Sequence, residues 1–184
     1  MLKSIVIIIF GLIAGVLILA ATKPDVFRVE RRASIDAPPD AVFTQLNDFK
    51  RWGAWSPWEK KDPSMKRSFG AATSGKGATY AWEGNSEVGQ GSMQIVDSAA
   101  PSRVALKLDF LKPFEAHNDV EFTLVPNGAS TEVTWTMQGP TPYFAKILHV
   151  FVDMDRMVGQ DFESGLANLK AMLEQTREKP GGAK

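Results

Sequence analysis

The feature that most constrains the fold is an alternation of apolar and polar side chains through the middle of the chain. In residues 103–110 the large apolar side chains occupy every second position, and residues 119–124 and 132–137 repeat this pattern. Because successive side chains of a strand point to opposite faces of a sheet, each segment is predicted to be a strand with one buried face. The Asn127-Gly128 pair between the last two segments is typical of a tight hairpin turn. We therefore predict an antiparallel meander with one solvated face.

Strand and helix signals flank this meander. Residues 26–35 indicate a first strand, and the prolines at 38 and 39 open a short helix over 41–46, because proline is tolerated in the first helical turn. From Phe144 to Leu173, apolar residues recur at three- and four-residue steps, which predicts one long amphipathic helix. Its apolar stripe needs a cover, and the concave face of a curved sheet provides one. The predicted fold class is α+β.

An uncharged apolar run of eighteen residues, 4–21, follows Lys3. At about 1.5 Å per residue, a helix of this length reaches roughly 27 Å, close to the ~30 Å hydrocarbon thickness of a bilayer. A secretory signal peptide is the rival reading, but its apolar region is usually about 7 to 15 residues long, and Leu19-Ala20-Ala21 matches a cleavage site poorly. We predict one uncleaved transmembrane helix within residues 1–22, inserted in the plasma (inner) membrane as a single-pass anchor that contacts the bilayer through residues 4–21.

The orientation of the anchor stays open. Four basic residues that follow the run outnumber Lys3, which favours a cytoplasmic domain, but three of them fall in the predicted strand at 26–35. A lysine before an apolar run is also an ordinary start for a signal anchor. Beyond the anchor we expect a single domain at residues 23–176 and a disordered tail at 177–184.

Composition excludes several function classes. The chain holds 21 basic and 21 acidic residues, whereas a nucleic-acid-binding protein normally carries a basic excess or a basic stripe. We therefore expect no nucleic acid among its partners. Because the chain has no cysteine, it forms no disulfide and offers neither a thiol nucleophile nor a thiolate metal ligand.

Several stretches resemble the START-like, or SRPBCC, superfamily, in particular the polyketide cyclase/dehydrase-like group and its membrane-anchored bacterial members. These stretches are WSPWEKKDPSM at 55–65, GATYAWEGNSEVGQGSMQI at 77–95, FLKPFEAHNDVEFTLVPNG at 110–128, TEVTWTMQG at 131–139 and MDRMVGQDFESGLANLK at 154–170. The resemblance implies a helix-grip fold, in which a curved antiparallel sheet wraps around a long C-terminal helix. It also implies an apolar cavity between that sheet and helix.

Large apolar side chains on the inward faces are the candidate lining of this cavity, because ligand pockets are lined mostly by such residues. The candidates are Trp52, Trp55, Tyr80, Trp82, Met93, Phe110, Phe122, Trp135, Met137 and Phe151. An ordinary hydrophobic core has the same composition. The expected partner is a hydrophobic small molecule or lipid, held by a membrane-anchored binding domain.

The segment RWGAWSPW at 51–58 holds three of the five tryptophans. Gly53 and Pro57 break regular structure, so Trp52, Trp55 and Trp58 cannot share one helical face. The resemblance implies that this segment lies near the mouth of the cavity. We therefore expect at least one of the three, Trp55, to be partly exposed there, although all three could also close one corner of the core.

No catalytic, cofactor or metal site is predicted. The two histidines, His117 and His149, are expected at the surface or rim, and they are too far apart in sequence to suggest a zinc site. Asp97 falls on the same predicted face as Met93 and Ile95, but the turn signal that follows it favours a position at the solvent-exposed end of the strand. Two alternatives remain open: a cyclase- or hydratase-like enzyme, which needs an inward polar group, and a ligand-free protein-interaction module.

Overall fold

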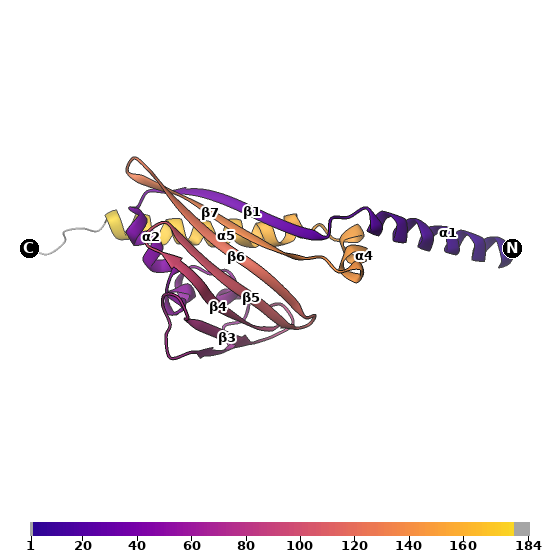
Figure 1. The fold of residues 1–184 in the computed structure, drawn as a ribbon, viewed down its shortest axis with the longest axis horizontal. Helices are drawn as coiled ribbons and strands as arrows, with labels where there is room; N and C mark the ends of the chain where they lie inside the picture. The colour runs from indigo at the N-terminus through magenta and orange to yellow at the C-terminus, as the bar shows by residue number, and fades with distance from the viewer. Residues whose placement is uncertain (1, 179–184) are drawn as a thin grey trace, which may run out of the picture.

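The alternating segments pair into one seven-stranded antiparallel sheet in the computed structural model, which describes residues 2–178. The strands are β1 (Val26–Ile35), β2 (Lys66–Phe69), β3 (Thr79–Glu83), β4 (Gln90–Ala99), β5 (Arg103–Lys112), β6 (Ala116–Asn127) and β7 (Ser130–Pro140). Their order across the sheet is β1-β7-β6-β5-β4-β3-β2, so only β1 leaves the sequential meander (Figure 1). Asn127 pairs with Ser130, so Gly128 and Ala129 form the two-residue loop of the β6–β7 hairpin, and Gly128 has φ of 61° at its first position.

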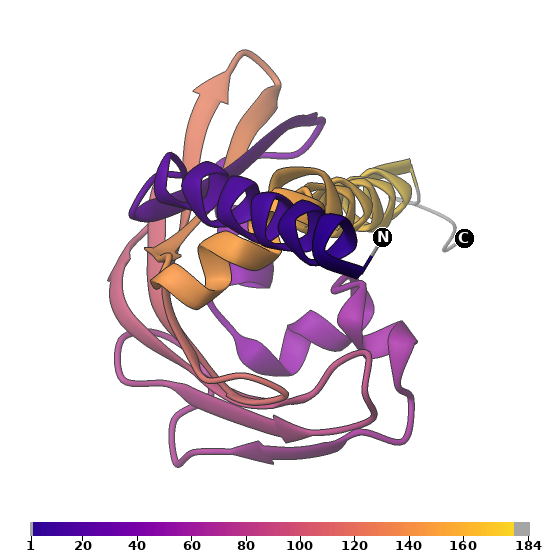
Figure 2. The same cartoon turned by 90° about the vertical axis from the view of Figure 1, so that its right-hand side faces the viewer.

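The helices lie at the two ends and along one side of the sheet (Figures 1 and 2). They are α1 (Leu2–Ala21), α2 (Pro39–Leu46), the 3₁₀ helix η1 (Phe49–Ala54), α3 (Trp58–Lys61), α4 (Tyr143–Phe151) and α5 (Met154–Glu178). The curved sheet wraps around α5, which packs chiefly along β1. This is the predicted helix-grip arrangement, and α1 projects from one end of it.

The two faces of the sheet differ as the alternation predicts. On the inward face of β5 and β6, Val104, Leu106 and Phe122 are at most 1% exposed. On the outward face, Arg103 pairs with Glu121, and other oppositely charged residues follow the same pattern. Burial of the inward side chains drives the sheet against α5.

The predicted long C-terminal helix is confirmed as α5, but its predicted start at Phe144 is wrong, because the chain breaks between α4 and α5. Val152 adopts an extended conformation with φ −118° and ψ 124°. The carboxylate of Asp153 then accepts a hydrogen bond from the backbone N–H of Arg156 at 3.0 Å, which caps the start of α5. As a result, the apolar residues before and after the break face different surroundings.

Two glycines of α5 give room to side chains from the sheet. A Cβ at Gly165 would lie 2.9 Å from Trp135 and 3.2 Å from Pro57, so only glycine fits beneath the indole ring. A Cβ at Gly159 would overlap the guanidinium of Arg31, which lies across the helix and binds Glu163 and Asp155. These glycines let the helix and sheet approach closely.

The N-terminal helix is long and apolar enough over Lys3–Ala21 to cross a membrane, and most of its side chains are exposed. A signal sequence near the N-terminus can also be long and apolar enough, so these properties alone do not distinguish the two. Of the predicted tail, residues 179–184 lie outside the described residues, while α5 continues to Glu178.

Candidate functional site

Trp55 is fully buried, at 0% exposure, so the prediction that it lies partly exposed at a cavity mouth is wrong. It follows η1 directly, and its carbonyl oxygen accepts a hydrogen bond from the Asn168 side chain of α5 at 3.0 Å. Its ring meets Phe122 and Trp135 edge-on, with centroids 6.2 and 5.7 Å apart. The segment therefore turns inward, because the apolar rings gain more from the core than from the rim.

The aromatic rings around Trp135 form a closely packed centre between the sheet and α5. Trp135 stacks on Phe162 with centroids 4.0 Å apart and planes 7° apart. Phe122 lies 4.8 Å from Trp135, and Trp52 lies 5.0 Å from Trp55. The rings touch one another in this conformation, so side chains fill the centre of the predicted cavity.

The candidate lining residues fall into three groups. Those buried in the core are Trp52, Trp55, Tyr80, Trp82, Phe122, Trp135 and Met137. Met93 and Phe110 are half-buried and pack against the core from β4 and β5. Phe151 is 71% exposed on α4, which contradicts its expected place on the inward stripe, because the break after α4 separates its helix from α5.

The concave face is less completely covered toward the end of the sheet that adjoins α1. We call this end the proximal half, and its inward side chains Phe27, Leu108 and Phe110 are only half-buried. At the other end, the distal half, inward side chains such as Ile35 and Val133 are 0% exposed. The proximal half therefore presents partly exposed apolar side chains.

Four buried side-chain groups on the concave side have no hydrogen-bond partner within residues 2–178. They are Nε1 of Trp55, Nε1 of Trp135, Oδ1 of Asn118 and Oγ1 of Thr141. Other indoles of the core are satisfied: Trp52 donates to the carbonyl oxygen of Leu46 at 3.1 Å, and Trp82 donates to that of Val88 at 2.9 Å. An unpaired buried polar group costs about 1–3 kcal/mol, so these four atoms need an explanation.

Three of the four groups, those of Trp135, Thr141 and Asn118, lie along one inward row of the β6–β7 pair. Trp135 and Thr141 point to the same buried side as Gly139, which lies between them in sequence. Asn118 lies beside Gly139, where a Cβ would approach Asn118 Oδ1 closely. At about 3.3 Å per residue, the row extends roughly 20 Å from Trp135 to the proximal end of the sheet.

A polar network missed by the sequence analysis lies at the edge of the concave face. Tyr80 Oη donates to Oε1 of Glu59 at 2.9 Å, while Arg67 Nε donates to Oε2 at 2.7 Å. Burial, and then the adjacent Glu59 carboxylate, raise the pKa of Tyr80 well above its usual range. The phenol stays protonated and both carboxylate oxygens are engaged, so the network suits positioning better than proton transfer. No sequence pattern predicts this network, because Glu59, Arg67 and Tyr80 come from three different elements.

The titratable residues weighed from sequence lie away from this site. His117 is exposed on the outward face, where its Nδ1 lies 2.7 Å from Oδ1 of Asp109. Asp97 pairs with Arg103, also on the outward side. His149 is half-buried on α4. Among the described residues, no group of three histidine or acidic side chains could hold a metal ion.

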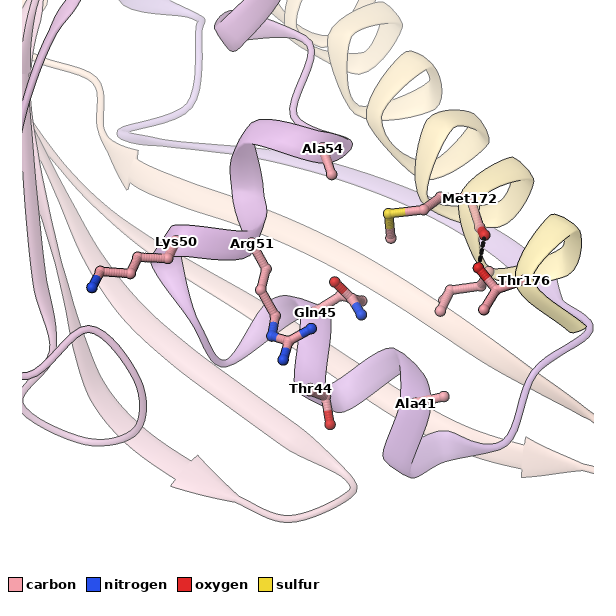
Figure 3. Close-up of a pocket in the computed structure, with 9 residues that line it drawn as sticks. Ala41, Thr44, Gln45, Lys50, Arg51, Ala54, Met172 and Thr176 are labelled. Atoms are coloured by element: carbon pink, nitrogen blue, oxygen red, sulfur yellow. Dashed lines mark hydrogen bonds between the residues drawn. The ribbon is translucent and has the colours of Figure 1, made fainter.

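Two open grooves lie at the distal end, outside the sheet–α5 interface. The first, of about 510 Å³, separates α2 and η1 from the last turns of α5, and Figure 3 shows Met172 and Thr176 of α5 on one side of it. The second, of about 560 Å³, adjoins it along α5. Both are broad and shallow, unlike the predicted cavity.

A model of the family described as "Polyketide cyclase / dehydrase and lipid transport" matches residues 26–174. The chain belongs to this family. The match covers the sheet and nearly all of α5, and it begins after the N-terminal helix. No protein of curated function is significantly similar in sequence.

Solved structures share the fold at low sequence identity. Protein CV1439 from Chromobacterium violaceum is 13% identical, with a TM-score of 0.58, over 83% of this chain and 99% of its own. Aha1 from Colwellia psychrerythraea, solved as a dimer, is 16% identical with a TM-score of 0.58, over 80% and 96%. DynU16, a protein of the dynemicin biosynthetic locus, is 17% identical with a TM-score of 0.57, over 83% of this chain and 48% of its own. At these identities the likeness establishes the fold alone.

Proposed function

We propose that this protein binds a hydrophobic small molecule or lipid that carries an oxygen acceptor. The proposed site is the proximal half of the concave face, and α1 anchors the protein in a membrane. The observation that carries the proposal is the set of four buried polar groups without partners. The indole N–H groups of Trp55 and Trp135 can donate to a carbonyl or ester oxygen, whereas the hydroxyl of Thr141 can donate or accept.

The shape of the face supports an elongated amphiphile. Apolar side chains surround the unpaired groups, and the row from Trp135 to Thr141 runs toward the half-buried proximal end. Because the rings around Trp135 touch, a ligand that reaches its Nε1 must move Phe162 or Trp55 aside. A ligand that supplies an acceptor there offsets the free energy lost by the unpaired donor.

Binding explains these observations better than the two alternatives. A cyclase or hydratase needs a titratable group tuned for proton transfer, and the Tyr80–Glu59 pair is tuned toward a protonated phenol. A ligand-free interaction module leaves the four buried groups unpaired. The family description includes lipid transport, which is compatible with a bound lipid.

The test begins with native mass spectrometry of the full chain, purified from membranes, in which a bound ligand is expected as an added mass. Trp135→Phe removes the Nε1 donor and keeps an aromatic ring, so we expect ligand affinity to fall about three- to tenfold, as for one lost hydrogen bond. Trp52→Phe is the matched control, because the Trp52 donor is already paired with Leu46. It should lower stability and leave affinity unchanged.

Two results would overturn this proposal. One is the absence of any bound mass combined with unchanged tryptophan fluorescence on addition of phospholipids and fatty acids. The other is an equal loss of affinity in both variants. Recovery of the full-length protein in the pellet after a carbonate wash is the separate test of the anchor, and a soluble form shortened by about twenty residues contradicts it.

A further inference from the structure

The short helix α4 exposes its most apolar face. Phe144, Leu148 and Phe151 are 61%, 40% and 71% exposed, and their spacing places them on one side of the helix. The side toward the protein instead carries Lys146, which is 8% exposed and pairs with Asp25. A helix of a soluble protein has the opposite arrangement, with its apolar stripe toward the core.

Neighbouring residues extend this face into a patch. Phe114, in the connection between β5 and β6, is 64% exposed, and its ring lies 6.3 Å from that of Phe144. We call this surface the α4 patch: Phe114, Tyr143, Phe144, Leu148 and Phe151. Single exposed apolar residues are ordinary, whereas a contiguous group of this kind marks an interaction surface.

The α4 patch is continuous with the N-terminal helix. Tyr143 Oη donates to the carbonyl oxygen of Leu17 at 2.9 Å, and Ala20 is completely buried where the two helices pack together. Leu17 lies one turn before the end of α1, about 6 Å along the helix axis at 1.5 Å per residue. Therefore, when α1 spans a bilayer, α4 lies at the level of its interface (Figures 1 and 2).

From this geometry we propose that the α4 patch inserts into the interfacial layer of the bilayer and forms a second membrane contact beside α1. Amphipathic helices that lie in a membrane interface typically bury their apolar face by about 5–10 Å. The charged residues near the patch in sequence are of both signs: Lys112 and Glu115 lie on either side of Phe114, and Lys23 and Asp25 precede β1. The contact is thus apolar in origin and depends little on lipid charge or salt.

This contact would hold the proximal half of the concave face against the membrane surface. A lipid could then pass between bilayer and binding site without crossing bulk water, because the half-buried Phe27 and Phe110 lie at the same end. The inference rests on the anchor proposed above and is independent of whether a ligand binds.

Site-directed fluorescence tests the contact, since the chain has no native cysteine. The full chain is reconstituted in phosphatidylcholine vesicles, with one environment-sensitive label per variant and nitroxide-bearing lipids as quenchers. The patch variants are Phe114→Cys, Phe144→Cys, Leu148→Cys and Phe151→Cys. Two exposed controls lie outside the patch: Gln138→Cys at the same end of the sheet, and Val125→Cys at the far end.

We expect labels in the patch to be quenched several-fold more than the label at position 138, and the label at 125 to be unaffected. Replacing part of the lipid with phosphatidylglycerol, or adding salt, should leave this difference unchanged. Equal quenching at positions 138, 144 and 151 overturns the proposal. Labels shielded from both lipid nitroxides and aqueous iodide also overturn it, because a protein partner or second copy then covers the patch. The carbonate wash reports on the anchor separately.

Discussion

The two halves of the concave face are built from the same strands but are packed differently. In the distal half, the inward residues of β1, β6 and β7 are sealed by α5 and α2, and side chains such as Leu124 and Val133 have almost no exposed surface. In the proximal half, the inward side chains Phe27, Leu108 and Phe110 are half-buried. The buried polar atoms of Asn118 and Thr141 in this half have no partner within the described residues.

This difference separates the structural role of the fold from its proposed binding role. A fully packed, fully paired region contributes stability and has no room for a ligand. A region with partly covered apolar surface and unpaired polar groups contributes less stability, and a ligand can complete it. The break between α4 and α5 lies at the proximal end of the sheet, where α5 begins at Met154 (Figure 1).

The sharpest comparison uses two inward leucines of β5. Leu106 is 1% exposed, while Leu108, one inward position closer to α1, is half-buried. We expect Leu106→Ala to lower the free energy of unfolding by about 2–5 kcal/mol. Leu108→Ala should lower it by only about 1–2 kcal/mol, because part of that side chain already contacts water, and it should also weaken ligand binding. Chemical denaturation of the full chain in detergent measures both, and equal losses contradict the distinction.

The two glycines of α5 extend the comparison to smaller effects. Gly165→Ala places a methyl group against the packed ring of Trp135, so we expect a loss of about 1–3 kcal/mol, despite the higher helix propensity of alanine. Gly159→Ala meets only the flexible end of Arg31, which can move away. Its effect should stay within about 0.5–1 kcal/mol, since exposed ion pairs contribute little. A larger loss at Gly159 than at Gly165 in thermal unfolding would show that the proximal end is the more rigid one.

The smallest expected effects concern the two histidines, whose pKa values should move in opposite directions. The hydrogen bond that protonated His117 donates to the Asp109 carboxylate, and then the charge of that carboxylate, raise the pKa of His117 on the outward face. Burial, and then the nearby charge of Lys23, lower the pKa of His149 on α4. The contribution of His117 to stability is therefore present below its ordinary pKa and is lost as the pH rises through the raised value. NMR titration should show the pKa of His117 falling in Asp109→Asn, and a pKa of His117 below that of His149 in the unmodified chain contradicts both assignments.

Local patterns were sufficient to predict the sheet and its faces. Alternation along β5, β6 and β7 identified Leu106, Phe122 and Trp135 as inward residues, and each is buried. The same alternation predicted that Met93 and Phe110 lie on the inward face, and both are half-buried there. These predictions succeeded because the period of two is a property of the strand itself. The proposed ligand role of these residues stays a prediction.

Other features depend on contacts that sequence spacing does not reveal. Trp55 is buried among rings from distant elements, and its carbonyl oxygen accepts a hydrogen bond from Asn168, 113 residues away along the chain. The network around Glu59 depends on the docking of α3 against β2 and β3. The end of α4 also escaped prediction, because the apolar spacing continues across Val152 and Asp153 while the backbone does not.

The sequence by itself determined the antiparallel sheet, its inward face, the apolar N-terminal helix and the amphipathic character of the C-terminal segment, because each follows from a local period or composition. Only the tertiary structure decided which inward side chains are fully buried and which are partly exposed. It also decided which indole donors lack partners and where α4 places Phe144 relative to Leu17 and the rest of α1. Burial and hydrogen-bond pairing are properties of neighbours brought together from distant parts of the chain, so the proposed binding face and the α4 patch form only once the sheet has closed around α5.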